Sequence, residues 1–333
     1  MKIAFISNGS ATLNAANNGT KVQILTWKRM LEQKGHQVDL ITYWCSYEWA
    51  SYDAIVVFRM EAYFLEFLRD LRKINSRIFI APILDPNYNK IGMTLKSYWG
   101  SEKLRLMNRH YAIRCSRRSV MGYLVRSDYE GKYLSSCFNI PENMIFKVPL
   151  SYGDIQNRDI PPKENFCFHA SRLTDKHKNV HRLIEAAKKY KFKLKLAGRV
   201  SNESDKEKLL SWIDGSELIE CLGYLTDEEL ENYYLRAKVF ALPSLYEGVG
   251  LAALEAAVRG CNIVITKEGG PREYFEGYAS LVNPKSIDEI GKGISSFMND
   301  DINYQPDLMN HLRDYYSEKT LAEVLECTLS CGN

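Results

Sequence analysis

Short apolar strands alternate with helical stretches along both halves of the chain, and this alternation constrains the fold more than any other feature. In the first half the expected strands are KIAFIS (2–7), HQVDLIT (36–42), DAIVVF (53–58), RIFIAPIL (77–84) and YLVRS (123–127), and a helix is expected at 21–35. In the second half they are FCFHA (166–170), FKLKLAG (192–198), KVFAL (238–242) and CNIVIT (261–266), with helices at 179–190 and from Leu251. Strands that alternate with helices form parallel sheets covered by helices. The sequence therefore predicts an α/β protein.

The length of 333 residues favours two domains over one. The stretch SYGDIQNRDIPPKEN (151–165) is rich in proline and polar residues and is the best candidate for a linker. The two sides of it differ in charge: residues 1–160 carry 22 Lys and Arg against 14 Asp and Glu, and the remainder carries 22 against 27. We expect one α/β domain at 1–155 and another at 160–305, with a cleft between them.

Composition and cysteine usage indicate a cytoplasmic protein. No stretch approaches the roughly 18 uncharged apolar residues of a membrane span, and the N-terminal MKIAFISNGS resembles a strand rather than a signal peptide. The eight cysteines show neither CxxC spacing nor Cys/His pairing, so we expect reduced, mostly buried thiols and no metal site.

The stretch SLYEGVGLAALEAAVRG (244–260) places a carboxylate on an apolar helix face. Leu251, Leu254 and Val258 follow the spacing of one face, and Glu255 occupies the remaining position on it. A carboxylate removed from water needs a partner, supplied by the protein or by a ligand. Gly248, Val249 and Gly250 precede the helix, where backbone N–H groups and the helix dipole favour an anion such as phosphate. Taken alone, Glu255 is as well explained by a contact with a neighbouring helix.

A dinucleotide fingerprint is one interpretation of this stretch. Gly248, Gly250 and Ala253 satisfy the permissive GxGxxG/A pattern, and Glu268 provides an acidic residue about twenty positions further on. The fingerprint glycines should follow a strand directly, whereas five residues separate KVFAL from Gly248. An NAD-dependent oxidoreductase is therefore the alternative of second rank.

The same stretch resembles the signature of the retaining nucleotide-sugar glycosyltransferases of group 1, family 4, which have the GT-B fold. In their pattern, PSxxEGxGLxxLEAxAxGxPV, Asn262 replaces the late proline. The matching residues are Pro243, Ser244, Glu247, Gly248, Gly250, Leu251, Leu254, Glu255, Ala256 and Gly260. The segment KEGGPREYFEG (267–277) is similar to the family's GGxxE loop, HASRLTDKHKNVHRLIEAA (169–187) to its arginine and lysine clamp, and ECLGYLTDEELENYYLRAKVFALPS (220–244) to its stretch near the base. The resemblance covers nearly all of residues 166–285.

The resemblance implies a hexosyltransferase that uses a UDP- or GDP-sugar and needs no metal. Glu255 would hold the ribose hydroxyls and Glu247 the donor sugar, while Arg172 and Lys178 would neutralise the departing diphosphate, as electrostatic catalysis requires. The remaining donor contacts would come from the residues Gly248, Val249, Gly250, Leu251, Gly223 and Tyr224. Lys176 is an alternative to Lys178, and solvated loop positions explain Glu247 and Arg172 without any function.

The first half matches the family less closely. Gly19, before the first helix, is similar to the family's glycine-rich loop, and the resemblance implies that it contacts the nucleotide-sugar. An ordinary turn would also place a glycine there. Many members carry a His after a strand of this half, where this chain has IVVFRMEAY (55–63), and Asp85 is a candidate acidic residue or turn cap. By resemblance, the first domain would bind the acceptor, the second the donor, and a C-terminal helix at about 306–333 would pack back onto the first. A non-catalytic nucleotide-sugar-binding subunit remains an alternative.

Residues 90–118 are basic and rich in aromatic and apolar residues. They contain eight Lys or Arg and one acid, Glu102. Such a segment is able to lie on an anionic membrane surface, and a solvated helix face explains it equally well. Nucleic-acid binding is a weaker interpretation. Since lipid-linked acceptors are common in the family, we expect a cytoplasmic enzyme of surface-polysaccharide synthesis that associates with the inner face of the membrane.

Overall fold

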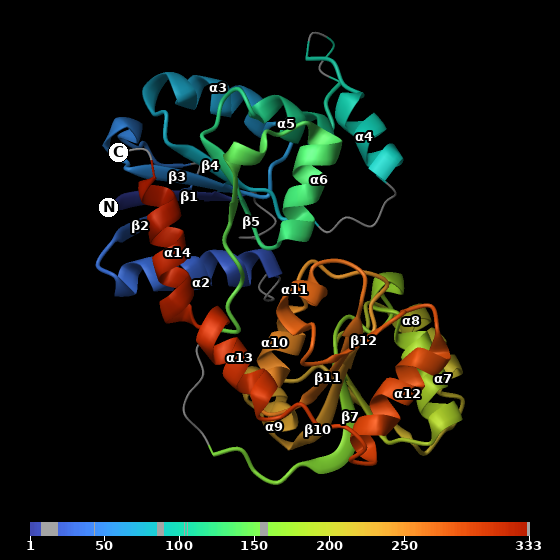
Figure 1. Cartoon of the computed structure of the whole chain (residues 1–333). Helices are drawn as coiled ribbons and strands as arrows, with labels where there is room; N and C mark the ends of the chain where they lie inside the picture. The colour runs from blue at the N-terminus through green and yellow to red at the C-terminus, as the bar shows by residue number, and fades with distance from the viewer. Residues whose placement is uncertain are drawn as a thin grey trace. The chain divides into compact units, whose positions relative to one another are not determined.

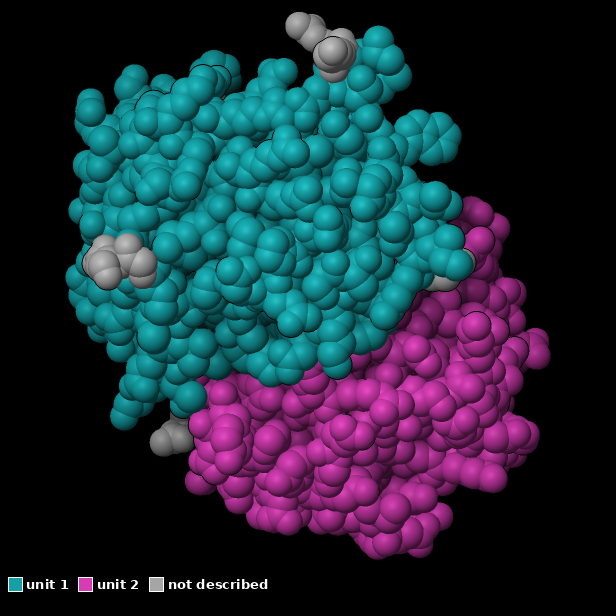
Figure 2. All heavy atoms as spheres, turned by 45° about the horizontal axis from the view of Figure 1, so that its top comes forward, with its two compact units in different colours: residues 1–151, 318–333 teal, residues 152–317 magenta. Residues whose placement is uncertain are grey.

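The structure is a computed structural model that describes residues 1–7, 19–42, 44–84, 90–102, 104, 106–153 and 159–331. The chain divides into two compact units, coloured separately in Figure 2. The first comprises Met1–Ser151 and Glu318–Asn333, and the second comprises Tyr152–Ser317. Both chain ends therefore belong to the first unit (Figure 1).

The first unit contains a six-stranded parallel sheet in the order β2-β1-β3-β4-β5-β6. Its strands are β1 (Lys2–Ser7), β2 (Gln37–Leu40), β3 (Ala54–Phe58), β4 (Ile78–Ala81), β5 (Gly122–Val125) and β6 (Ile145–Lys147). Its helices are α2 (Gly19–Gln33), α3 (Phe64–Ile74), α4 (Lys90–Tyr98), α5 (Arg109–Ser116), α6 (Asp128–Phe138) and α14 (Glu318–Ser330).

Helices cover both faces of this sheet, as Figure 1 shows. On one face α3, α5 and α6 enclose a core with the side chains of β3 and β4. On the other face α2 packs against α14 and buries Trp27 near Phe58. Every residue of β3, AIVVF, is buried, because a central parallel strand has no solvent-facing side.

The second unit contains a six-stranded parallel sheet in the order β12-β11-β10-β7-β8-β9. Its strands are β7 (Glu164–Ala170), β8 (Leu194–Ala197), β9 (Ile219–Gly223), β10 (Ala237–Leu242), β11 (Asn262–Thr266) and β12 (Ser280–Val282). Its helices are α7 (Val180–Tyr190), α8 (Glu203–Ile213), α9 (Asp227–Arg236), α10 (Leu251–Ala257), α11 (Pro271–Phe275), α12 (Ile287–Met298) and α13 (Asp307–Tyr316).

The strand order of the second sheet places a topological switch point between β7 and β10. The chain runs outward from β7 through β8 to β9, then crosses to β10 and runs outward in the opposite direction. In doubly wound sheets of this order, ligands bind beyond the carboxyl ends of the strands at the switch point. The helices α7, α8 and α12 pack on one face, and α9 and α10 lie on the other (Figure 1).

The predicted α/β class is confirmed, since both sheets are parallel and covered by helices. Sequence patterns located most strands to within a few residues, but they did not separate β6 or β9, two strands with partly exposed side chains. The expectation of mostly buried thiols is wrong: all eight cysteines are free, and Cys45, Cys221, Cys327 and Cys331 are exposed. Within the described residues, no helix has both the length and the apolar composition that a bilayer span requires.

The C-terminal segment that belongs to the first unit begins at Glu318, later than the expected position near 306. Helix α13 stays with the second unit because it buries Leu308 and Leu312 and packs against α10. Helix α14 then lies along α2, where Glu326 accepts from Lys34 at 2.5 Å and contacts the ring of His36 at 2.8 Å.

Leu325 provides a test of this packing, because its side chain is fully buried on α14. We expect Leu325→Ala to lower the free energy of unfolding by about 2–5 kcal/mol, the usual cost of deleting a buried leucine side chain. Urea denaturation followed by circular dichroism measures this change. Glu323→Ala, on the exposed face of the same helix, is the control and should change stability by less than about 0.5 kcal/mol. Equal effects would contradict the docking of α14.

Candidate functional site at the switch point of the second sheet

The loops after β7 and β10 are tied together by the side chain of Asn179. Its amide nitrogen donates to the carbonyl oxygens of Pro243 at 2.8 Å and Pro284 at 2.7 Å, and the residue is fully buried. Asn179 has a φ of +60°, a conformation that asparagine tolerates better than most residues. A further bond runs from the Leu245 N–H to the His177 carbonyl at 2.8 Å. These bonds fix the two loops that meet at the switch point.

Lys178 and Glu247 form an ion pair across these loops. The Lys178 Nζ donates to Glu247 Oε1 at 2.7 Å, and the Glu247 side chain is only 11% exposed. The His177 Nε2 lies 3.8 Å from the same oxygen. Lys176, the sequence alternative to Lys178, is exposed in the short 3₁₀ turn Lys176–Lys178. The geometry favours Lys178 as the lysine of this cluster.

The environment of Glu247 keeps its carboxylate ionised. Burial alone would raise the pKa of Glu247, but the Lys178 ammonium and the neighbouring His177 ring outweigh burial and lower that pKa to about 2. Glu247 is therefore an acceptor-only group at neutral pH. A ligand hydroxyl would meet a fixed negative charge there.

Gly269 holds the backbone of Glu247 in place. The Glu247 N–H donates to the Glu268 carbonyl at 3.1 Å, and the Gly270 N–H donates to the Glu247 carbonyl at 3.1 Å. A Cβ on Gly269 would lie 2.0 Å from the Glu247 carbonyl oxygen, and the φ of Gly269 is +108°. Only glycine fits, so the GG loop after β11 acts as a backbone support for Glu247.

Helix α10 follows the glycine-containing loop and carries Glu255. Gly250 has a φ of +90°, and a Cβ there would lie 2.7 Å from Ile265 Cδ1, so the chain turns into the helix only through glycine. The N–H groups of Ala253 and Leu254 bond to the Gly250 carbonyl. The N–H groups of Leu251 and Ala252 come before the first hydrogen bond of the helix, as at the start of any helix.

Glu255 has only a weak partner within the protein. The hydroxyl of Tyr234 donates to its Oε2 at 3.4 Å, while Arg259 bonds to the Glu255 backbone carbonyl and forms its ion pair with Glu231. Of the residues that the structure describes, none forms an ion pair with the Glu255 carboxylate. Burial raises the pKa of Glu255 to about 7, and the more distant charge of Arg259 only partly offsets this. The two glutamates of the motif therefore occupy opposite electrostatic environments.

The remaining predicted residues of the second unit lie at the same edge of the sheet. Gly223 ends β9, and its carbonyl accepts from the Gly198 N–H at 2.7 Å. Tyr224 is exposed and lies against the guanidinium of Arg199, 4.5 Å from its ring centroid. Arg172 follows β7, but its side chain is 74% exposed and pairs with Asp175 at 2.8 Å, so it does not contact the Lys178–Glu247 pair.

His169 is a residue of this edge that the sequence did not single out. It is fully buried in β7, with Nδ1 2.7 Å from the Ala241 carbonyl and Nε2 2.6 Å from the Ser171 hydroxyl. Burial lowers its pKa to about 4, so the ring is neutral and links β10 to the loop that carries Arg172. Neither periodicity nor spacing marks this role, because it depends on a neighbour 72 positions away.

The first unit contributes Gly19 alone among the predicted site residues. It begins α2, which follows β1 in the chain, and residues 8–18 between them lie outside the described part, as does Asp85. At the end of β3, where a His was sought, the structure has Arg59 with a φ of +57°. Its guanidinium lies 3.4 Å from Glu61.

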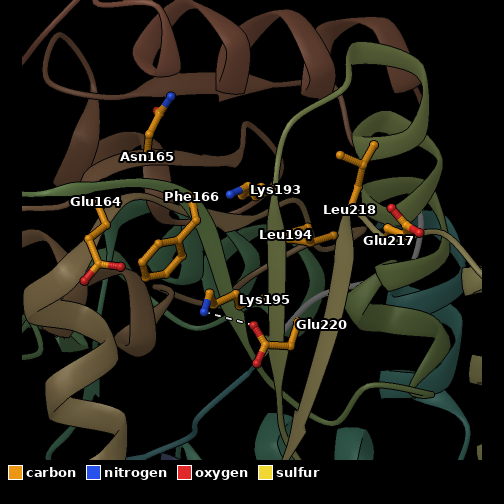
Figure 3. Close-up of a pocket in the computed structure, with 9 residues that line it drawn as sticks. All are labelled: Glu164, Asn165, Phe166, Lys193, Leu194, Lys195, Glu217, Leu218 and Glu220. Atoms are coloured by element: carbon orange, nitrogen blue, oxygen red, sulfur yellow. Dashed lines mark ion pairs between the residues drawn. The ribbon is translucent and has the colours of Figure 1, made fainter.

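A cavity of about 410 Å³ is lined by none of these residues (Figure 3). It is formed by the amino ends of β7, β8 and β9, and Lys195 and Glu220 form an ion pair of 2.9 Å beside it. Its lining contains no residue of the motif. Among the described residues, no group of three or more His, Cys, Asp or Glu side chains is placed to hold a metal ion.

The structure argues against the dinucleotide alternative. Strand β10 ends at Leu242 and α10 begins at Leu251, so Gly248 belongs to an eight-residue loop rather than to a tight strand-to-helix turn. In addition, β10 is the fourth strand of its sheet in chain order, whereas the fingerprint belongs to the first βα turn.

Asn179 gives a test of how the two loops are held. We expect Asn179→Ala to lower the free energy of unfolding by about 2–4 kcal/mol, because two buried carbonyls lose their donor and alanine is strained at positive φ. Asn179→Gly should lower the free energy of unfolding by about 1 kcal/mol less than Asn179→Ala, because glycine adopts a positive φ without strain but still leaves both carbonyls without their donor. Urea denaturation of both variants measures the difference. If Gly and Ala were equally destabilising, the left-handed conformation would not matter.

Comparisons with known proteins give the family and the fold. Residues 154–319 match the model of the family described as glycosyl transferases group 1. The O-antigen chain mannosyltransferase RfbU of Salmonella typhimurium is 22% identical over 60% of this chain and 58% of its own length. The N-acetylgalactosamine-N,N'-diacetylbacillosaminyl-diphospho-undecaprenol 4-alpha-N-acetylgalactosaminyltransferase of Campylobacter jejuni is 28% identical over 43% of this chain and 40% of its own length. The chain thus matches little more than half the length of the first of these relatives and less of the second.

A solved structure extends the likeness over the whole fold. Anabaena Alr3699/HepE in complex with UDP superimposes with a TM-score of 0.71 over 99% of this chain and 100% of the other, at 15% identity. At that identity the likeness concerns the fold. The chain therefore belongs to the family of group 1 glycosyl transferases, and its two doubly wound units are those of the GT-B fold.

Proposed function

We propose that this protein transfers a hexose from a UDP- or GDP-sugar to a glycan or lipid-linked acceptor, with retention of configuration, in the assembly of a surface polysaccharide. The observation that carries the proposal is the ionised Lys178–Glu247 pair at the switch point, with the poorly partnered Glu255 eight residues further on. The relatives named above that act on O-antigen and on an undecaprenol-linked sugar support the acceptor class. The UDP complex of the Anabaena protein supports the donor class.

Each charged residue of the site has a role in this proposal. The Lys178 ammonium has three N–H donors, of which one goes to Glu247, so it is able to bridge Glu247 and a phosphate oxygen. As the donor bond breaks, Lys178 and the exposed Arg172 would stabilise the negative charge that develops on the diphosphate. Glu247 would accept from hydroxyls of the donor sugar and orient its anomeric carbon.

The nucleotide would lie along the carboxyl edge of the second sheet. Glu255 would accept from the ribose hydroxyls, which would supply the strong partner that its carboxylate lacks within the protein. Backbone groups at Gly248, Val249, Gly250 and Leu251 would meet the diphosphate, and Gly223 and Tyr224 the base. Gly19 of the first unit stays a prediction for nucleotide-sugar binding. We place the enzyme on the cytoplasmic face of a membrane.

The raised pKa of Glu255 leads to a pH-dependent affinity. Ribose hydroxyls would donate to the ionised carboxylate, so binding favours the deprotonated form of a group whose free pKa is about 7. The affinity for the correct nucleotide-sugar should therefore rise about tenfold between pH 6 and pH 8 and level off above it. A UDP-sugar or GDP-sugar suits this test because its diphosphate does not titrate near neutral pH.

Isothermal titration calorimetry measures this profile, after thermal-shift screening of UDP, GDP, NAD and their sugar conjugates. Glu255→Gln should bind more weakly at pH 8 and show a flat profile, and Glu276→Gln, an exposed carboxylate on the same unit, should behave like the wild type. A profile that stays flat in the wild type would remove Glu255 from the nucleotide site. A thermal shift with NAD alone would overturn the proposed function.

Glu247 and Glu255 should separate in kinetics. We expect Glu247→Gln to lower kcat by about 10²–10³-fold with nucleotide affinity largely kept, because its contacts act on the reacting sugar. Glu255→Gln should mainly raise the donor KM. Nuclear magnetic resonance of the product's anomeric proton reports retention. Binding of the donor without transfer or hydrolysis, in the wild type, would instead indicate a non-catalytic subunit.

A further inference from the structure

Helix α4 of the first unit turns its larger apolar face away from the protein. Met93 and Ser97 are its buried residues, and they face α5 and α6, against which the helix packs. Ile91, Leu95 and Tyr98 lie at positions i, i+4 and i+7, and all three are more than half exposed. Figure 1 shows α4 at the edge of the first unit, beside α6. A helix that only covers a core buries its apolar face, whereas α4 exposes its larger apolar side chains to solvent.

The turn after α4 extends this apolar surface. Ser101 and Leu106 pair through two backbone bonds of 2.8 and 2.9 Å, and the Asn108 amide donates to the carbonyls of Lys96 and Trp99 at 3.1 and 2.6 Å. The turn is thus anchored by hydrogen bonds at both of its ends. We name as the apolar ridge the six side chains that α4 and this turn expose by 53–80%, namely Ile91, Leu95, Tyr98, Trp99, Leu104 and Leu106.

The segment that carries the ridge is basic in sequence. The one acid of residues 90–118, Glu102, is paired with Arg69 at 2.5 Å. Lys90 and Lys96 are exposed on α4 itself, and Lys103 and Arg105, in the same segment, lie outside the described residues. Amphipathic surfaces that combine Trp, Tyr and Leu with lysines suit the boundary between lipid headgroups and acyl chains.

The arginines that follow in the sequence have structural roles instead. Arg109 donates to the carbonyls of Met60, Pro82 and Ile83 at 2.7–3.1 Å, and so ties the loops after β3 and β4 together. The Arg114 guanidinium stacks on the Tyr98 ring at 3.5 Å, and Arg117 donates to the Asn139 carbonyl at 2.8 Å. Reversing these charges would disturb the fold. The membrane contact that the sequence predicted for residues 90–118 is therefore assigned here to the apolar ridge with Lys90 and Lys96.

We propose that the apolar ridge inserts into the headgroup region of an anionic lipid bilayer, with Lys90 and Lys96 contacting the lipid phosphates. Large apolar side chains that gather on a surface mark interaction sites. The exposed Lys90 and Lys96 favour an anionic partner at this one. The biological purpose of this contact rests on the proposed function, because a lipid-linked acceptor is met at a bilayer. The contact itself depends only on the ridge and its charges.

Vesicle co-sedimentation of the full chain tests the proposal. The probes are vesicles of phosphatidylcholine with phosphatidylglycerol at a ratio of 7 to 3, and vesicles of phosphatidylcholine alone. We expect binding to the anionic vesicles to be at least tenfold stronger, and the triple variant Ile91→Ser/Leu95→Ser/Trp99→Ser to lose at least tenfold of it. The matched control Leu210→Ser/Ile302→Ser/Tyr315→Ser removes exposed apolar side chains from the second unit and should bind like the wild type.

Two further measurements keep the outcome clear. Lys90→Glu/Lys96→Glu should weaken anionic binding at low salt, whereas equal binding to both vesicle types would overturn the choice of an anionic surface. If the triple variant bound vesicles normally, or if it differed from the wild type only in self-association by analytical ultracentrifugation, the bilayer proposal would be wrong. A thermal shift with nucleotide in each variant verifies that the variant is folded. If the wild type bound anionic vesicles but showed no thermal shift with any nucleotide, the proposed function would be refuted and the bilayer proposal would stand.

Discussion

The parallel pairing of β7 with β10 is the constraint on which the rest of the candidate site depends. Val239 lies opposite Cys167 and Phe240 opposite Phe168, although the two strands are far apart in the sequence. Their pairing creates the switch point, and the loops that leave it carry Lys178 and Glu247. Asn179 then bonds to the carbonyls of two different loops, so the position of the ion pair follows from backbone geometry rather than from the charges themselves.

The two glutamates of one motif show how packing assigns different chemistry to identical side chains. Both are largely withdrawn from water, and burial alone would raise the pKa of each. Glu247 lies 2.7 Å from an ammonium and stays ionised, whereas Glu255 has a tyrosine hydroxyl at 3.4 Å and titrates near neutral pH. A fixed charge suits the orientation of a sugar, and a poorly partnered carboxylate suits a ligand that brings its own donors.

The first unit differs from the second in what its surface leaves uncovered. Helix α4 packs on α5 and α6 through its buried residues Met93 and Ser97, and its outer face takes no part in this packing. The cost of exposing Leu95 and Trp99 to water is therefore not required by the fold. Exposed apolar surfaces of this kind mark sites where a partner binds, and the exposed Lys90 and Lys96 favour anionic lipid as that partner.

The sequence by itself determined the α/β class, the approximate positions of most strands and the motif that holds Glu247 and Glu255, because periodicity and glycine spacing are local properties of the chain. Local patterns do not record long-range packing. The strands β6 and β9, the start of the return at Glu318 and the exposure of four cysteines depend on such packing. The same holds for the residues that complete the site. His169, Tyr234 and Gly269 act through partners that only the folded sheet brings within bonding distance, and the opposite pKa values of the two glutamates arise from those neighbours.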